Sequence, residues 1–556
     1  MNRRRALVPE NFRPLNPSDF VFHGFGDGLA RLEERIGQLG IRDGEPWVET
    51  VEDAVFVPSG ATRGPGRSHT SGVIIAADGQ PVDAARVRRK GGKLPRRQGE
   101  PVAVEPRREV DEPVVYLGPL FNHYGRLLLE SLARVWFLAE ADPSVRVVFD
   151  YTNAAERTQA PWALRILDAF GIPAERLLVL DTPTRLRRVM IPEALFEQGN
   201  AAHEAMVRPF REVAARVADG VDRTEQPVYL SRRLLTSLQR PIVGEEELED
   251  VLRENGFLVV YPETMDFADQ VRLFNRHVHV VSSVDCAAHT LLFARTRPEL
   301  HLLTIEHTAS NYFLCSALAE APTTFVNCLG TGHREDYTAE RDTGEGRRRG
   351  GDRSATLAIG PQATPQLIEL PTLMAYLDQR GFLTRRLRAP LAGRDPALRQ
   401  RYDEAWVFGR IRKAIKQGLA LPAEVETEAM QVAQGSWPVS AALARYYAET
   451  RQDPEQMVEM ACLLADLLSA ESEMNRLAHY RAEVEGLVMR VIGLCRSDVA
   501  VRLAETVADR FGTEAASADE GDVTARLRRR AARRDGRGQP PRPHGEETAS
   551  ATAPPD

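Results

Sequence analysis

Short apolar runs alternate with helically spaced apolar residues along residues 113–330. Continuous runs are typical of buried strands, and apolar residues three or four positions apart are typical of helices. The alternation predicts an α/β fold, in which helices cover both faces of a parallel sheet. Two successive blocks of it predict two doubly wound domains facing a cleft. The predicted strands are 113–117, 145–149, 228–230, 257–261, 278–282, 301–305 and 323–326, and the predicted helices are 127–138, 161–170, 245–255, 266–276, 311–320 and one beginning near 288.

Changes in composition divide the chain into six regions. A helical region without a repeat period is interpreted as an α-helical appendage, with protein docking through these helices as the alternative. The basic run 526–534 is a solvated tail or a weak contact to anionic lipid head groups. The regions are a strand and loop segment at 1–112, α/β domains at 113–225 and 226–330, a charged Gly-rich linker at 331–365, an α-helical region at 366–512 that includes helices at 457–468 and 476–492, and a tail at 513–556 that is disordered by composition.

Composition narrows the class of protein. A chain of 556 residues is too long for one hydrophobic core. Its 72 Lys and Arg against 79 Asp and Glu give a net charge of −7, which does not indicate a nucleic-acid partner. No segment approaches the roughly 20 apolar residues that span a bilayer. The five cysteines lack CxxC spacing, so we expect a cytoplasmic protein, with peripheral contact to the inner membrane face as an open alternative.

Lysine is nearly absent from the chain. The four lysines are Lys90, Lys93, Lys413 and Lys416, all outside residues 113–330. A P-loop or Schiff-base lysine is therefore excluded from the α/β region. Phosphate or carboxylate recognition there has to use arginine, backbone amides and helix ends.

Residues 121–136 form the first stretch that carries candidate chemistry. Arg126, Glu130 and Arg134 interrupt an apolar segment at four-residue spacing, so on a helix they would line one face. Such a face is either a ladder of ion pairs or part of a polar site.

Residues 278–293 form the second stretch. A buried strand passes through Ser282, Ser283 and Asp285 directly into a predicted helix, and this geometry lets backbone N–H groups and the helix dipole bind a diphosphate. His289 in that helix could contact a ligand or could be a structural histidine.

The order of the motifs resembles glycosyltransferase family 61, which includes many bacterial capsular-polysaccharide enzymes. The resemblance covers about residues 110–330. It implies a GT-B-like architecture, in which the second domain binds a nucleotide-sugar donor and the first binds a glycan or lipid-linked acceptor. It also implies transfer with inversion at the anomeric carbon and no cofactor besides the donor. The matching segments are 122–136, Val228-Tyr229-Leu230-Ser231-Arg232-Arg233, 240–248, Asn255-Gly256-Phe257, Tyr261-Pro262-Glu263, Phe267-Ala268-Asp269-Gln270 and 282–293.

The resemblance also implies which residues form the site. An inverting transfer needs a base for the acceptor hydroxyl and positive charge where the nucleoside diphosphate leaves. Glu130 or His123 is the candidate base, and Arg232 with the helix after Asp285 would stabilise the leaving group, although the charge of Asp285 could repel it. The further candidate binding residues are Arg126, Arg134, Glu246, Gln270, His289, Thr290 and Glu306.

Three departures from the family pattern leave an alternative open. Arg126 stands where a histidine is usual, Ser282 to Asp285 replace a glycine-rich turn, and Thr290 replaces an asparagine. A catalytically inactive protein that binds a sugar or a nucleotide sugar on the same fold is therefore the second hypothesis. No two aspartates are separated by one residue, so we expect no Asp-x-Asp metal site and activity without a metal. Asp285 and Glu306 are the carboxylates most able to converge on an ion.

Overall fold

The computed structural model describes residues 11–59, 72–88, 104–151, 161–235, 242–305, 310–330, 365–383 and 396–470. Nearly all described residues up to 383 form one compact α/β unit, and helices from residue 396 onward belong to a second unit. The linker through residue 364, the helix predicted at 476–492 and the tail lie outside the described residues, as does Glu306. Among the described helices, none is both long and apolar enough to cross a membrane.

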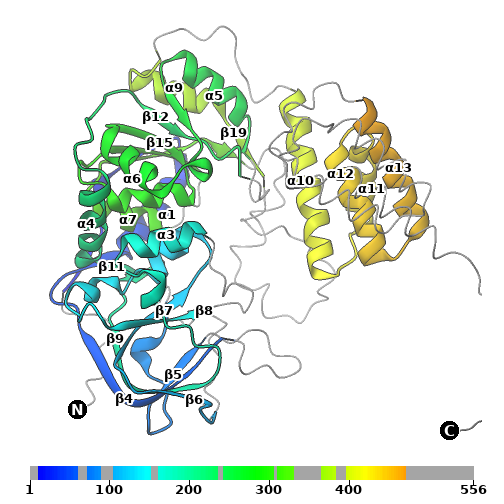
Figure 1. Cartoon of the computed structure of the whole chain (residues 1–556). Coiled ribbons are helices and arrows are strands. Elements are labelled where there is room, and N and C mark those ends of the chain that lie inside the picture. Colours follow the sequence, from blue (N-terminus) through cyan, green and yellow to red (C-terminus); the bar gives the residue numbers. More distant parts are fainter. Residues whose placement is uncertain are drawn as a thin grey trace, which may run out of the picture. The chain divides into compact units, whose positions relative to one another are not determined.

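A six-stranded parallel sheet forms the centre of the α/β unit (Figure 1). Its order is β14-β12-β15-β16-β17-β2, so the five strands from residue 228 onward follow the 2-1-3-4-5 order of a doubly wound fold. The sixth strand comes from the N-terminal segment and pairs in parallel with β17. The strands are β2 (Phe20–His23), β12 (Val228–Leu230), β14 (Leu258–Val260), β15 (His279–Ser283), β16 (Glu299–Thr304) and β17 (Thr323–Asn327).

Helices cover both faces of this sheet, as the alternation predicts. Figure 1 shows α5 and α9 on one side and α6 and α7 on the other. Gly256, at φ +84°, follows α5 and lets the chain turn into β14. The helix predicted near residue 288 is a 3₁₀ helix, η10, which begins two residues earlier. The bounds are α5 (Glu245–Glu254), α6 (Phe267–Arg276), η10 (Cys286–Phe293), α7 (Ser310–Ala319) and α9 (Leu370–Gln379).

The sheet in the first half of the unit is mixed. β6, β7, β8 and β9 pair in parallel, but β4 runs antiparallel to β9 and β5 antiparallel to β4. A wholly parallel, Rossmann-like sheet is therefore the wrong prediction for this half. Its strands are β4 (Val48–Val57), β5 (Val73–Ile75), β6 (Arg108–Val110), β7 (Val114–Leu120), β8 (Arg146–Tyr151) and β9 (Thr184–Pro192).

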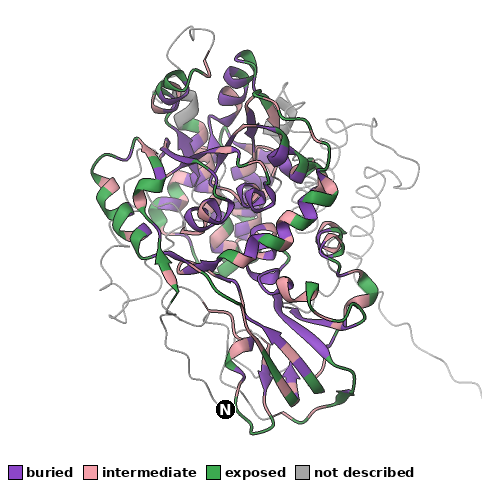
Figure 2. Ribbon diagram, turned by 90° about the vertical axis from the view of Figure 1, so that its left-hand side faces the viewer, coloured by how far each residue is buried: buried purple, intermediate pink, exposed green. Residues whose placement is uncertain are grey.

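One hydrophobic core joins the two halves of the unit. Phe293 of η10 contacts Phe170 and Phe210 of the first half, with ring centroids 5.9 and 4.9 Å apart. Figure 2 shows the buried residues concentrated in the sheets and the inner helix faces. The remaining elements are β1 (Phe12–Pro14), α1 (Leu29–Gly37), β3 (Gly40–Arg42), α3 (Pro161–Ala169), β10 (Phe196–Glu197), β11 (Ala201–His203), α4 (Val207–Val217), β13 (Ile242–Val243), β18 (Leu329–Gly330) and β19 (Gln366–Ile368).

The segment predicted as one helix over 127–138 is broken into two pieces, and a short helix precedes it. α2 (Tyr124–Arg126) leads into a π-helical turn, η4 (Leu127–Ser131), and a 3₁₀ helix, η5 (Val135–Ala139), follows. Leu132 has ψ 4° and Arg134 has ψ 0°, so the chain leaves helical geometry between Glu130 and Arg134. The prediction that Arg134 shares a helix face with Arg126 and Glu130 is therefore wrong.

The described part of the second unit consists of neighbouring helices with their own hydrophobic core. Val407, Ile411, Leu443 and Leu464 are fully buried in it. The helices are α10 (Pro396–Gln417), α11 (Ala423–Ala433), α12 (Trp437–Tyr446) and α13 (Pro454–Ala470), with a π-helical turn, η13 (Tyr447–Arg451). The predicted helix at 457–468 is confirmed within α13.

Candidate functional site

The carboxyl ends of β12 and β15 lie side by side at the point where the strand order reverses. In doubly wound sheets, ligands bind in the crevice at this position, because the loops leave the two strands toward opposite faces. Arg232 follows β12 and Asp285 follows β15. Their side chains meet at these strand ends, with Arg232 Nη1 3.4 Å from Asp285 Oδ2. The segment 228–233 and the second candidate stretch, 278–293, are therefore brought together.

Both members of this ion pair are anchored by further bonds. Asp285 is the N-cap of η10, and its Oδ1 accepts a hydrogen bond from Ala287 N at 3.2 Å. The backbone N–H of Arg232 donates to Glu245 Oε1 at 3.1 Å. The guanidinium of Arg232 and the backbone N–H of Ala287 both interact favourably with the carboxylate of Asp285. They therefore reduce the repulsion between that carboxylate and a diphosphate.

Glu245 is a buried acid behind Arg232. Tyr229 donates to its Oε1 at 2.8 Å, and burial raises the pKa of Glu245 to about 7. The residue predicted from the sequence is its neighbour Glu246, which is half-buried and lies 3.9 Å from Arg233 at the closest atoms. The sequence did contain a signal for the buried acids. At helical spacing, Glu245 and Glu249 fall on the same face of α5 as Leu248 and Leu252, which is the buried face.

Two candidate residues of the first half form a bidentate pair. Arg126 Nε donates to Glu130 Oε1 at 2.8 Å and Arg126 Nη2 to Oε2 at 3.3 Å. The guanidinium also lies 3.4 Å from the ring centroid of Phe121. The side chain of Glu130 is only 5% exposed, so Arg126 covers most of this carboxylate.

His123 stands at the start of the same segment and is exposed. Its Nε2 lies 3.8 Å from Cys286 Sγ, and Arg126 N donates weakly to its Nδ1 at 3.4 Å. Desolvation, followed by the charge of Arg126, lowers the pKa of His123. The imidazole is therefore neutral at pH 7 and can accept a proton.

The two motif segments touch directly. Tyr124 OH and Thr290 Oγ1 are 2.8 Å apart. Gly125 faces η10 so closely that a Cβ there would lie 3.0 Å from Cys286 Sγ. His289 is buried and stacks on Tyr312 with ring centroids 4.9 Å apart, and neither of its ring nitrogens has a hydrogen-bond partner among the described residues.

Two sequence-predicted residues, Arg134 and Gln270, bind backbone carbonyl groups instead of other site residues. Arg134 is 1% exposed and donates to the carbonyl oxygens of Pro192, Ala84 and Arg86. Gln270 donates to the carbonyl of Pro262 at 2.9 Å and so holds the turn η9 (Pro262–Thr264). Glu306 is outside the described residues.

Glu263, on the turn η9, lies near the site but was not among the predicted site residues. It belongs to the matching segment Tyr261-Pro262-Glu263. Partial burial and the nearby charge of Asp285 raise the pKa of Glu263, and the charge of Arg232 opposes the shift. Glu263 is therefore a second acid near the ion pair. The site as a whole combines a neutral imidazole, two ion-paired arginines and several carboxylates, which are groups able to bind a polar ligand and move a proton.

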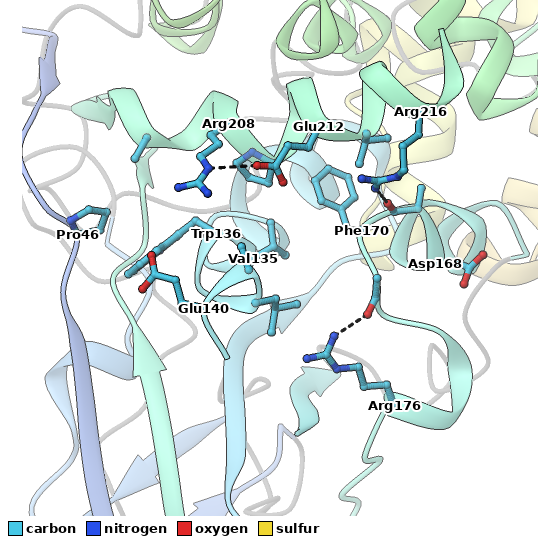
Figure 3. Close-up of a pocket in the computed structure, with 17 residues that line it drawn as sticks. Pro46, Val135, Trp136, Glu140, Asp168, Phe170, Arg176, Arg208, Glu212 and Arg216 are labelled. Atoms are coloured by element: carbon cyan, nitrogen blue, oxygen red, sulfur yellow. Dashed lines mark hydrogen bonds and ion pairs between the residues drawn. The ribbon is translucent and has the colours of Figure 1, made fainter. Parts of the chain in front are cut away.

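A separate hollow of about 500 Å³ lies between η5, the end of α3 and α4 (Figure 3). Trp136 and Phe170 line it, and Arg208 is ion-paired with Glu212 at 3.1 Å at its edge. None of the predicted site residues lines this hollow.

Comparison with known proteins gives one family. The glycosyltransferase 61 family matches residues 22–300, which is just over half of the chain. The match begins within β2 and includes the mixed sheet as well as the segments on which the resemblance rests. No curated protein matches the chain.

Proposed function

Because the chain belongs to the glycosyltransferase 61 family, we propose that it transfers a sugar from a nucleotide-sugar donor to a glycan or lipid-linked acceptor with inversion. The donor diphosphate binds at the carboxyl ends of β12 and β15. The observation that carries this placement is the Arg232–Asp285 pair at the reversal of strand order. Within the α/β unit, the first half supplies the acceptor side, in the manner of a GT-B-like enzyme.

The proposed leaving-group contact is Arg232. An arginine can bind phosphate oxygens through two parallel N–H groups, and these charge-assisted bonds are stronger than neutral ones. Binding of the diphosphate requires Arg232 to exchange part of its contact with Asp285. The N-cap bond from Ala287 N keeps Asp285 in place during this exchange.

The proposed base is His123. The alternative, Glu130, accepts two hydrogen bonds from Arg126 and is nearly covered, so an acceptor hydroxyl would have to displace the guanidinium to reach its oxygens. His123 is exposed, and its lowered pKa keeps the imidazole neutral, so that a ring nitrogen is available to accept a proton. It therefore takes the proton of the acceptor hydroxyl, while the Arg126–Glu130 pair positions the loop that carries it.

The cellular part of the proposal is surface or capsular polysaccharide assembly in the cytoplasm, as the family resemblance implies. The four cysteines within the described residues are free, and free cysteines fit a reducing compartment. The proposal also includes a protein partner that docks on the C-terminal helices. It further includes peripheral contact of the basic tail with the membrane.

The test is calorimetric titration of the full chain with UDP and GDP. Arg232→Ala should weaken nucleoside diphosphate binding by about 1.5–3 kcal/mol, the value of hydrogen bonds to charged groups. Asp285→Asn keeps an N-cap acceptor and removes the competing charge, so it should tighten binding. Arg208→Ala, at the edge of the hollow in Figure 3, is the matched control and should bind as the parent does.

Turnover separates the enzyme from an inactive binding protein. With any donor that the parent uses, His123→Gln should lower kcat by roughly a hundredfold or more, because a base contributes that much. Glu130→Gln should lower it less. Binding without transfer or hydrolysis in the parent would favour the binding protein. Weakened binding in Arg208→Ala but not in Arg232→Ala would move the donor site to the hollow.

A further inference from the structure

Three potential metal ligands meet at the amino ends of β15 and β16. His279 is the first residue of β15 and pairs in register with Glu299, the first residue of β16. His301 lies two residues beyond Glu299 and therefore on the same face of the sheet. One ligand atom from each residue lies within 4.8 Å of those of the other two.

Each of the three side chains also has one atom engaged by a residue outside the cluster. His279 Nε2 is 3.8 Å from Glu225 Oε2, and His301 Nδ1 is 2.6 Å from Tyr376 OH. Arg380 binds Glu299 Oε1. These contacts leave His279 Nδ1, Glu299 Oε2 and His301 Nε2 for the cluster itself, and the first two are 3.2 Å apart.

His301 gives the independent sign that a ligand is expected here. The residue is fully buried, and its Nε2 has no hydrogen-bond partner among the described residues. A buried polar atom left unpaired costs about 1–3 kcal/mol. The ring is packed against Phe382 and Tyr376, with centroids 5.4 and 5.9 Å away.

We propose that His279, Glu299 and His301 bind one divalent transition-metal ion, with Zn²⁺ as the natural occupant. Two imidazoles and a carboxylate are a common zinc ligand set, with water completing a tetrahedron. Ligands at about 2.0–2.1 Å in a tetrahedron are about 3.3 Å apart, and the 3.2 Å between His279 Nδ1 and Glu299 Oε2 matches this separation.

The outer contacts fit the same assignment. Metal-bound histidines usually present their second ring nitrogen to a carboxylate or another oxygen, which fixes the tautomer and the ring orientation. Glu225 and Tyr376 stand in these places for His279 and His301. The ion would tie β15 to β16 beneath α9, at the edge of the sheet opposite the proposed donor site, so its role is structural.

The test uses the full chain, stripped with a chelator, dialysed and titrated with Co²⁺ under visible absorption, with Zn²⁺ in competition. We expect uptake of one equivalent and the absorption of a four-coordinate ion. His279→Ala and Glu299→Gln should abolish this uptake. Tyr376→Phe should weaken it by about 10–100-fold, the usual effect of an outer contact. Zn²⁺ should also raise the unfolding temperature of the parent and not of His279→Ala.

His123→Ala is the matched control, because it removes a histidine beside Cys286 in a different part of the unit. It should bind Co²⁺ as the parent does. Uptake that persists in His279→Ala, or that is lost in His123→Ala instead, would overturn the proposal, and so would a parent that takes up no ion. His279 is partly exposed, so its replacement tests the site even if a variant of the buried His301 fails to fold.

Discussion

Arginine and carboxylate side chains neutralise one another around the proposed donor site. Arg232 pairs with Asp285, Arg126 with Glu130, and Arg233 with the buried Glu249. A diphosphate therefore meets cations that already have partners, and its affinity depends on how readily they exchange. Glu249 also accepts hydrogen bonds from Ser231 and Tyr261, so the pair that includes Arg233 is the least able to exchange.

Glu245 makes the stability of the α/β unit depend on pH. The pKa of Glu245 is raised from 4.5 to about 7 by burial. Between these values the native state binds more protons than the unfolded state, so stability falls as pH rises from about 4.5 to about 7. The loss is on the order of 3 kcal/mol.

Glu245→Gln should remove this part of the pH dependence, because glutamine has no proton to lose. Urea unfolding at several pH values measures the free energy of unfolding of parent and variant. As pH rises from about 4.5 to about 7, the stability of the variant relative to the parent should increase. Glu246→Gln, on the half-buried neighbour, should follow the parent throughout. Parallel curves for Glu245→Gln and the parent would contradict the raised pKa.

At the scale of single elements, β7 ends in an irregularity that directs the chain toward the site. The register of β7 against β8 shifts between Tyr116 and Pro119, and Gly118 in this interval has φ +94°. A Cβ at Gly118 would lie 2.8 Å from Arg134 Nη1. Arg134 thus fills the space beside the irregular strand, and it carries structure rather than a ligand.

Gly118→Ala should destabilise the α/β unit by about 1–3 kcal/mol, because it combines a strained φ with overpacking. Gly79→Ala is the control, since Gly79 has φ +80° but open space around its Cβ position. Denaturant unfolding should show a larger loss for Gly118→Ala than for Gly79→Ala. Equal losses would mean that Arg134 moves aside without cost.

The sequence predicted most strongly the elements whose contacts are close in sequence. The alternation of strands and helices from Val228 to Asn327 is found as predicted. Each strand there is followed directly by the helix that packs on the sheet, so the pattern is visible in short stretches of sequence. The place of β2 beside β17 was not predictable, since a four-residue strand pairs with a partner about 300 residues later. Local spacing likewise put Arg134 with Glu130, whereas the distant carbonyl groups of Ala84 and Pro192 bind it.

At the scale of the whole molecule, the proposed donor site and the proposed metal site lie at opposite ends of the strands of one parallel sheet. Arg232 and Asp285 lie at its carboxyl edge, and His279 and Glu299 lie at its amino edge. The six residue steps from His279 to Asp285 span about 20 Å at the rise of a strand. A metal at the amino edge is too far away to touch a diphosphate at the other edge, so stability and catalysis should respond separately to metal removal.

EDTA should therefore lower the unfolding temperature of the full chain and leave turnover unchanged, provided that the assay is run well below the new unfolding temperature. The loss of stability follows from removing a ligand that binds only the folded state. Transfer persists because the guanidinium of Arg232 and the amides at the start of η10 stabilise the leaving diphosphate without a metal ion. Thermal unfolding and initial rates on the same EDTA-treated sample measure the two effects. His279→Ala should show no further change in unfolding temperature with EDTA. Rates that fall in EDTA and recover with Mn²⁺ or Mg²⁺ would place a metal at the carboxyl edge and reject the metal-free mechanism.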